Sequence, residues 1–157
     1  MMRGKTAREL TEAEVRDLAV RYLTRREYGM EELRQKLLQR GADNDIADNV
    51  VSQLADENLV SDQRFAEMYI RTRIRRLFGP LKIRAELHSR GISDHLITES
   101  MPSGEETWFD SALQWASKRH RGELDYAARA KIYRSLMNRG FTHEQANVAL
   151  DNLNTTD

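Results

Sequence analysis

The sequence predicts an all-helical protein of three tandem three-helix repeats that form an elongated, curved array. Three observations support this fold class. An Arg-Gly pair recurs about every fifty residues, the chain has only two prolines, and it lacks long runs of β-branched residues. Charged residues make up 32% of the 157 residues, which suits a helical protein with much surface per residue.

The Arg-Gly pairs begin at Arg40, Arg90 and Arg139, which are 50 and 49 residues apart. Apolar residues stand three and seven positions before each arginine: Leu37 and Leu33, Leu87 and Ile83, and Leu136 and Ile132. Residues four apart share one helix face, so we expect these six side chains to be buried. A shared register at this spacing is typical of repeats that bury apolar faces against their neighbours.

The glycines of these pairs have a structural explanation. Gly41, Gly91 and Gly140 each stand where a helix is expected to end, and glycine readily adopts the left-handed turn found there. The preceding arginine complements the negative end of the helix dipole. Each repeat is therefore expected to contain a helix ending near the arginine, a tight turn and a further helix.

Periodicity and end signals predict nine helices, at about residues 12–26, 30–40, 43–57, 62–77, 80–90, 94–101, 104–120, 126–139 and 143–152. They group into a first repeat at 11–60, a second, basic repeat at 61–102 and a third at 103–153. Residues 1–10 are expected to form a flexible tail, and residues 154–157 a loose end.

Several helix starts carry capping signals. The capping box is expected at Thr11 with Glu14, at Ser103 with Glu106 and, in its glutamine form, at Thr142 with Gln145. Ser93 and Asp125 are further expected N-caps, and Gly79-Pro80 marks the end of one helix and the start of the next.

The sequence lacks the patterns that most enzymes need. It has no cysteine, no phosphate-binding glycine loop, no nucleophile elbow and no histidine pair at metal-binding spacing. The acidic pairs Glu31-Glu32 and Glu105-Glu106 fall in first helical turns, where they stabilise the dipole. We therefore predict a non-enzyme without metal or cofactor. No apolar stretch approaches the roughly 20 residues needed to span a bilayer, and no signal-peptide pattern opens the chain, so the expected location is the cytoplasm.

Positive charge is concentrated in the middle of a chain whose net charge is zero. Residues 61–92 hold eight Lys and Arg against three Asp and Glu, which gives +5, whereas residues 1–60 carry −2 and residues 93–157 carry −3. Such a segment can face nucleic acid or an acidic protein surface, or it can simply be solvated.

On a helix over 62–77, Arg64, Arg71 and Arg75 fall within about 40° of one another, opposite the apolar face. This stripe of guanidiniums suits phosphates or carboxylates. Three further cations complete the candidate binding set: Arg76, Lys82 and Arg84. Arg90 is interpreted as a dipole partner at its helix end.

Arg73 differs from its neighbours because helical geometry places it on the apolar face, between Tyr69 and Leu77. A charge there must pair with an acid or extend out to water. We predict a structural pair with Glu86 on the next helix, in preference to Asp56 or Asp62.

At these residues the chain resembles the RecX family of bacterial regulatory proteins. The resemblance covers roughly residues 15–152. It is carried by Asp62-Gln63-Arg64-Phe65-Ala66, by Gly79-Pro80-Leu81-Lys82-Ile83-Arg84-Ala85-Glu86-Leu87 and by Arg90-Gly91-Ile92, with weaker matches in the outer repeats. Ser61, Asn58 and Tyr28-Gly29 depart from the family pattern without affecting the fold.

The resemblance implies a regulator that binds the RecA protein and the RecA–single-stranded-DNA filament, inhibits its ATPase, strand-exchange and co-protease activities, and has weak affinity for DNA. We expect a monomer. Two other readings of the residues stay open: a helical-repeat protein that binds DNA directly through its basic middle unit, and a scaffold whose charges are only solvated.

Overall fold

The computed structural model describes residues 9–153, which form nine α-helices and no β-strand. This confirms the all-helical class. Of the expected terminal segments, most of the tail at 1–10 and all of the end at 154–157 lie outside the described residues.

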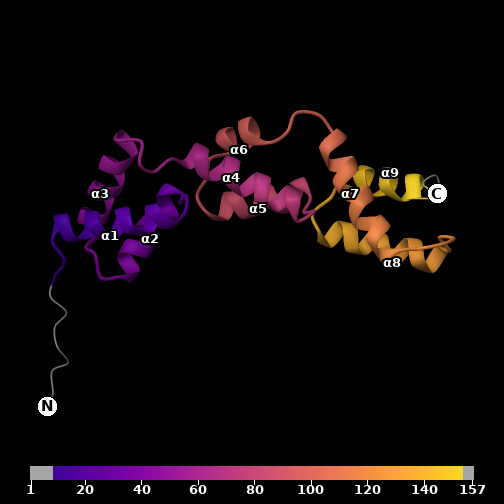
Figure 1. Ribbon diagram of the computed structural model, residues 1–157, viewed down its shortest axis with the longest axis horizontal. Helices are drawn as coiled ribbons and strands as arrows, with labels where there is room; N and C mark the ends of the chain where they lie inside the picture. Colours follow the sequence, from indigo (N-terminus) through magenta and orange to yellow (C-terminus); the bar gives the residue numbers. More distant parts are fainter. Residues whose placement is uncertain (1–8, 154–157) are drawn as a thin grey trace, which may run out of the picture.

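The helices form three consecutive groups of three, arranged in a row along the long axis (Figure 1). The first repeat contains α1 (Glu12–Arg25), α2 (Met30–Gln39) and α3 (Asn44–Asp56). The second contains α4 (Asp62–Arg75), α5 (Pro80–Ser89) and α6 (Asp94–Ser100). The third contains α7 (Glu106–Arg119), α8 (Tyr126–Asn138) and α9 (His143–Leu153). Every boundary lies within two residues of the sequence prediction.

Most of the expected caps are present. Thr11 and Glu14 form the capping box of α1, and Thr142 and Gln145 exchange the equivalent two hydrogen bonds at α9. The box expected at Ser103 is wrong. Gly104 has a φ of +81°, so it cannot serve as the first helical residue, and α7 begins only at Glu106.

All three Arg-Gly pairs end their helices with the same turn. Gly41, Gly91 and Gly140 have φ values of 95°, 81° and 93°. The residue after each glycine donates its amide to a leucine carbonyl five positions back: Ala42 to Leu37 at 3.0 Å, Ile92 to Leu87 at 3.1 Å and Phe141 to Leu136 at 3.1 Å. This is the Schellman motif, and the apolar residue after each glycine is buried beside its leucine.

The core follows the predicted helix faces. The six apolar residues that precede the arginines are at most 5% exposed. The buried side chains form two clusters, one within the first repeat and one continuous through the second and third repeats. The second and third repeats therefore pack as one body, and the first repeat has a core of its own.

A tight backbone contact, here called the second joint, connects the second and third repeats. The turn at Phe78-Gly79 lies against the turn at Arg139-Gly140. The Gly79 amide donates to the Arg139 carbonyl at 2.7 Å, and the Leu81 amide donates to the Gly140 carbonyl at 2.9 Å. A Cβ atom on Gly79 would lie 2.3 Å from the Gly140 carbonyl carbon, so only glycine allows this approach.

Arg139 reinforces the second joint by capping a helix of the neighbouring repeat. Its Nε donates to the Leu77 carbonyl at 3.2 Å, and a terminal nitrogen donates to the Arg76 carbonyl. Its guanidinium also lies 3.7 Å from the centre of the Phe78 ring. The carbonyls at the end of α4 are among those without a partner inside the helix, so a cation there satisfies them and complements the dipole.

The equivalent contact between the first and second repeats, the first joint, relies more on polar side chains. Arg90 beside Gly91 pairs with Glu32 at 3.0 Å. The Met30 amide donates to Asp62 Oδ1 at 2.7 Å, which ties the start of α2 to the start of α4. The two joints therefore use corresponding turns, but the second is secured by backbone hydrogen bonds and a shared core.

Replacing Gly79 by Ala tests the second joint. The new methyl would overlap the backbone of Gly140, which cannot move aside as a flexible side chain can. We expect Gly79→Ala to lower the free energy of unfolding by roughly 2 kcal/mol or more, measured by urea denaturation.

Gly29→Ala is the matched control. Gly29 is the N-cap of α2 as Gly79 is the N-cap of α5, but its Cβ would meet only side-chain atoms at 3.4–3.5 Å. It should cost about 1 kcal/mol or less, since only N-cap preference changes. Equal losses in the two variants would contradict the backbone contact.

Candidate binding surface of the middle repeat

Arg71 and Arg75 are the most available cations of the middle repeat. They lie one turn apart on α4, so they share a face, and both side chains are exposed. Within residues 9–153 the structure gives neither guanidinium an ion pair or a side-chain hydrogen bond. Arg76 follows at the end of α4 and is exposed too. Apart from Arg73, this end of the helix therefore presents positive charge that no acid of residues 9–153 neutralises.

Two further candidates, Lys82 and Arg84, lie on α5 and are held weakly. Lys82 Nζ is 3.4 Å from the Asn138 carbonyl and 5.3 Å from the centre of the Phe78 ring. Arg84 donates to the Thr98 hydroxyl at 3.3 Å. Among the described residues neither side chain is paired with a carboxylate, so both can turn toward a ligand with little loss.

Arg64 is placed differently from the stripe expected for it. Its Nε donates to Glu27 at 3.0 Å, and its terminal nitrogens donate to the side-chain and backbone oxygens of Asn58, each at 2.9 Å. The guanidinium thus links the second repeat to the first. The stripe of three free arginines on α4 reduces to Arg71 and Arg75, because Arg64 is already occupied.

Arg73 and Glu86 form the ion pair expected from the sequence. An Arg73 terminal nitrogen lies 2.6 Å from Glu86 Oε2, Nε lies 2.8 Å from the same oxygen, and the Tyr69 hydroxyl also donates to it. Both charged side chains are about one fifth to one quarter exposed. Burial opposes the charge on Arg73, but the hydrogen bonds with Glu86 and Tyr69 outweigh it and raise the Arg73 pKa.

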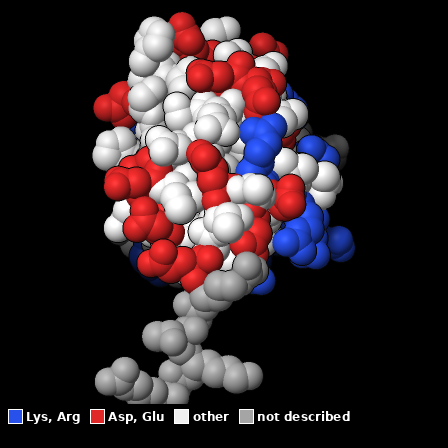
Figure 2. All heavy atoms as spheres, turned by 90° about the vertical axis from the view of Figure 1, so that its left-hand side faces the viewer, with Lys and Arg blue, Asp and Glu red and all other residues white. Residues whose placement is uncertain are grey.

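Charge is unevenly distributed over one end of the array. Acidic side chains dominate the end of the array formed by the first repeat, and basic ones gather at one side of that view (Figure 2).

Among the described residues, no cluster of His, Asp and Glu could hold a metal ion. No helix in the same part of the chain is long and apolar enough to cross a membrane.

Sequence reasoning missed the roles of Arg90 and Arg139 at the joints. Each was expected only to complement its own helix dipole. Arg90 instead pairs with Glu32 of the first repeat, and Arg139 caps α4 of the second. Their recurrence beside a glycine was the available signal, but the sequence does not say which neighbouring turn each pair contacts.

Three family models match successive parts of the chain. They describe the first three-helix domain of RecX at residues 16–54, the second at 61–101 and the third at 105–150. A regulatory protein RecX from Chromohalobacter salexigens is 43% identical over 141 residues, covering 88% of this chain and 92% of the relative. One from Halorhodospira halophila is 37% identical, covering 86% and 85%.

A solved structure has the same architecture. The crystal structure of RecX from Lactobacillus salivarius superposes with a TM-score of 0.80 over 92% of this chain and 97% of that one. At 22% identity this likeness shows the shared fold alone.

Alanine variants at Arg73 and Arg71 should separate the structural from the exposed arginine. Arg73→Ala leaves the mostly buried Glu86 without its cation, so the free energy of unfolding should fall by roughly 1–2 kcal/mol, less than for a fully buried pair. Arg71→Ala should change it by less than about 0.5 kcal/mol. Urea denaturation followed by circular dichroism measures both. An Arg73→Ala protein as stable as the wild type would contradict the structural role.

Proposed function

The chain belongs to the RecX family, and from that premise we propose that it is a non-enzymatic regulator that binds RecA and the RecA–single-stranded-DNA filament. Its proposed effect is to inhibit the filament's ATPase, strand-exchange and co-protease activities. The family's regulatory character supports the proposal, as do relatives named regulatory protein RecX. The partner itself comes from the family resemblance.

The observation that carries the proposal is the pair of free guanidiniums on α4. Arg71 and Arg75 are exposed and adjacent on one face, and no acid within the described residues neutralises them. Binding a carboxylate or phosphate there breaks no existing ion pair. A guanidinium can hold either group through two parallel hydrogen bonds, so the pair suits a partner with acidic side chains or phosphates.

The elongated form supports the same proposal. Three repeats in a row present Arg71, Arg75 and Lys82 on the central unit, flanked by a repeat on each side. A repeat array of this kind offers an extended surface, and extended surfaces suit extended partners such as filaments.

A second candidate is direct DNA binding through the same basic middle unit. The same free guanidiniums favour it, because phosphates are equally good ligands for them. Under this alternative, binding to single-stranded DNA needs no RecA, and affinity falls steeply with salt whether RecA is present or absent.

Reversing both charges, as Arg71→Glu with Arg75→Glu, should weaken inhibition of RecA strand exchange at least tenfold in the concentration required. Charge reversal on an exposed surface repels an acidic partner but contributes little to folding, so the melting temperature should stay within a few degrees. Strand-exchange assays and thermal melts measure the two effects.

A matched control carries Arg25→Glu with Arg40→Glu, which changes the net charge equally at exposed positions of the first repeat. It should inhibit like the wild type. If R71E/R75E also inhibits like the wild type, this surface is not the contact. If R71E/R75E loses DNA binding in the absence of RecA as well, the second candidate gains over the first.

A further inference from the structure

A cleft in the third repeat lies outside the basic middle unit. It opens between α7 and α8 and encloses about 710 Å³. Its floor includes Trp115 and Ile132, and Ser135 on α8 holds the indole in place by accepting a 2.8 Å hydrogen bond from Trp115 Nε1. No Asp or Glu of the described residues lines this cleft.

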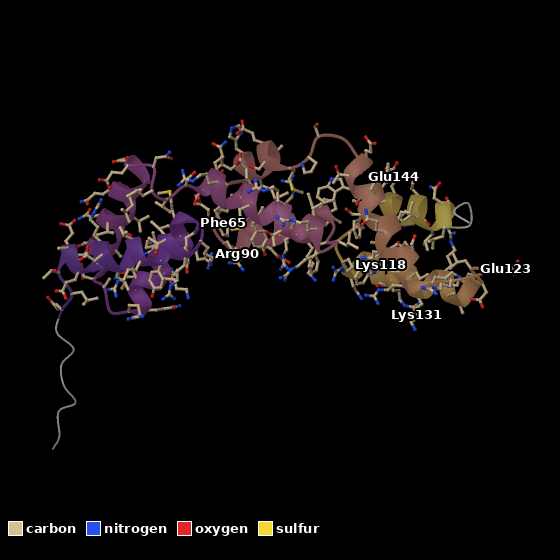
Figure 3. The ribbon with its side chains drawn as sticks, in the orientation of Figure 1. Phe65, Arg90, Lys118, Glu123, Lys131 and Glu144 are labelled. Atoms are coloured by element: carbon tan, nitrogen blue, oxygen red, sulfur yellow. The ribbon has the colours of Figure 1, made fainter. Side chains whose placement is uncertain are left out.

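Cations from both helices surround the cleft. Lys118 and Arg119 come from the last turn of α7 and Lys131 from the middle of α8, and all three side chains are exposed. Figure 3 shows Lys118 and Lys131 near each other at the crossing of these helices, whereas Glu123 lies at the far end of the repeat and Glu144 on its opposite side. These two carboxylates therefore lie away from the cleft, and the ion pair of Arg129 with Asp151 joins residues that do not line it.

The arginines at this site contact aromatic rings and not carboxylates of the described residues. The Arg119 guanidinium lies 3.7 Å from the centre of a Trp115 ring, and Arg139 lies 4.0 Å from it. Arg139 in turn contacts Phe78 at the second joint. Cation–π contacts stabilise a guanidinium without neutralising its charge, so the positive field of the cluster persists at the cleft.

The pKa of Arg139 is sensitive to these neighbouring charges. Burial, together with the nearby charges of Arg119 and Arg73, lowers the pKa of its guanidinium. An anion entering the cleft would relieve this repulsion. The gain adds to whatever hydrogen bonds the anion forms with Lys118 and Lys131.

We propose that the cleft between α7 and α8 binds the phosphodiester backbone of single-stranded nucleic acid, through Lys118, Arg119 and Lys131. A positively charged groove that follows the phosphates is the usual setting for a single strand. Guanidiniums of Arg119 and Arg139 cover the Trp115 ring, so the proposed contact is to the phosphates and not to stacked bases. A single strand can bend to follow the walls of a cleft between two helices, whereas a stiff duplex can present only its outer backbone to it. This contact requires neither RecA nor the middle repeat.

Fluorescence anisotropy with a labelled oligothymidylate, without RecA, tests the proposal on the full chain. Lys118→Glu with Lys131→Glu should weaken binding at least tenfold. The slope of log affinity against log salt should also become shallower by about 1.4, since each phosphate contact contributes about 0.7 for a single strand. R25E/R40E makes the same change in net charge far from the cleft and should bind like the wild type.

Tryptophan fluorescence gives a readout that depends on the site. Trp115 is partly exposed in the cleft and Trp108 is buried, so oligothymidylate should change the fluorescence of the wild type but not of Trp115→Phe. Should K118E/K131E fail to fold, as judged by its melt, K118Q/K131Q removes the charges without reversing them and should still weaken binding severalfold.

Three results would overturn the proposal. The wild type could fail to bind the oligonucleotide. The folded cleft variants could bind it as tightly as the wild type, and the DNA contact would then lie elsewhere, for example on Arg71 and Arg75. Alternatively, polyglutamate could displace the oligonucleotide as effectively as unlabelled oligothymidylate does. The cleft would then be a site for acidic protein segments.

Discussion

The array depends on one repeated contact, in which the Arg-Gly turn of one repeat docks against the glycine turn of the repeat before it. At the second joint this contact is made by backbone atoms, with amides of one turn donating to carbonyls of the other at 2.7 and 2.9 Å. Such an approach leaves no room for a Cβ atom on Gly79. Gly140 is required for two reasons. The Schellman turn gives it a left-handed φ, and its backbone lies so close to that of Lys82 that a Cβ atom would not fit.

The two joints give the array two different kinds of connection. The second and third repeats share one apolar core, so burial of nonpolar surface and the backbone contact both oppose their separation. The first repeat has its own core and is held to the second largely by charged groups, among them Arg90 with Glu32 and Arg64 with Glu27. Ion pairs of this exposure are screened by salt, so the first joint should be the more responsive to ionic strength.

Sequence reasoning predicted what local chemistry determines. Helix bounds, the caps at Thr11 and Thr142 and the turns at the Arg-Gly pairs follow from residues a few positions apart. Arg73 with Glu86 was predictable because helical phase and a short connection place both in one repeat. The capping box predicted at Ser103 was wrong because Gly104 adopts a left-handed conformation, which the spacing of Ser103 and Glu106 does not reveal.

Contacts between repeats could not be predicted in the same way. The partners of Arg64, Arg90 and Arg139 lie 37, 58 and 62 residues away, and no local pattern states how one repeat sits on the next. The cleft of the third repeat was hidden by the net charge of −3 over residues 93–157, which averages its cations with acids on other faces. Only the folded arrangement separates the two.

Amide hydrogen exchange at Gly79 and Leu81 tests the docking contact most directly. Both amides donate across the second joint, to carbonyls of Arg139 and Gly140, and not within α5. If the joint is closed in the native state, these two amides exchange only when the second and third repeats separate. Because the two repeats share one core, that separation disrupts the packing of α8 as well. The two amides should therefore exchange as slowly as amides in the middle of α8. Rapid exchange at Gly79 and Leu81 while the helices stay protected would mean that the turns separate freely, which would contradict the account.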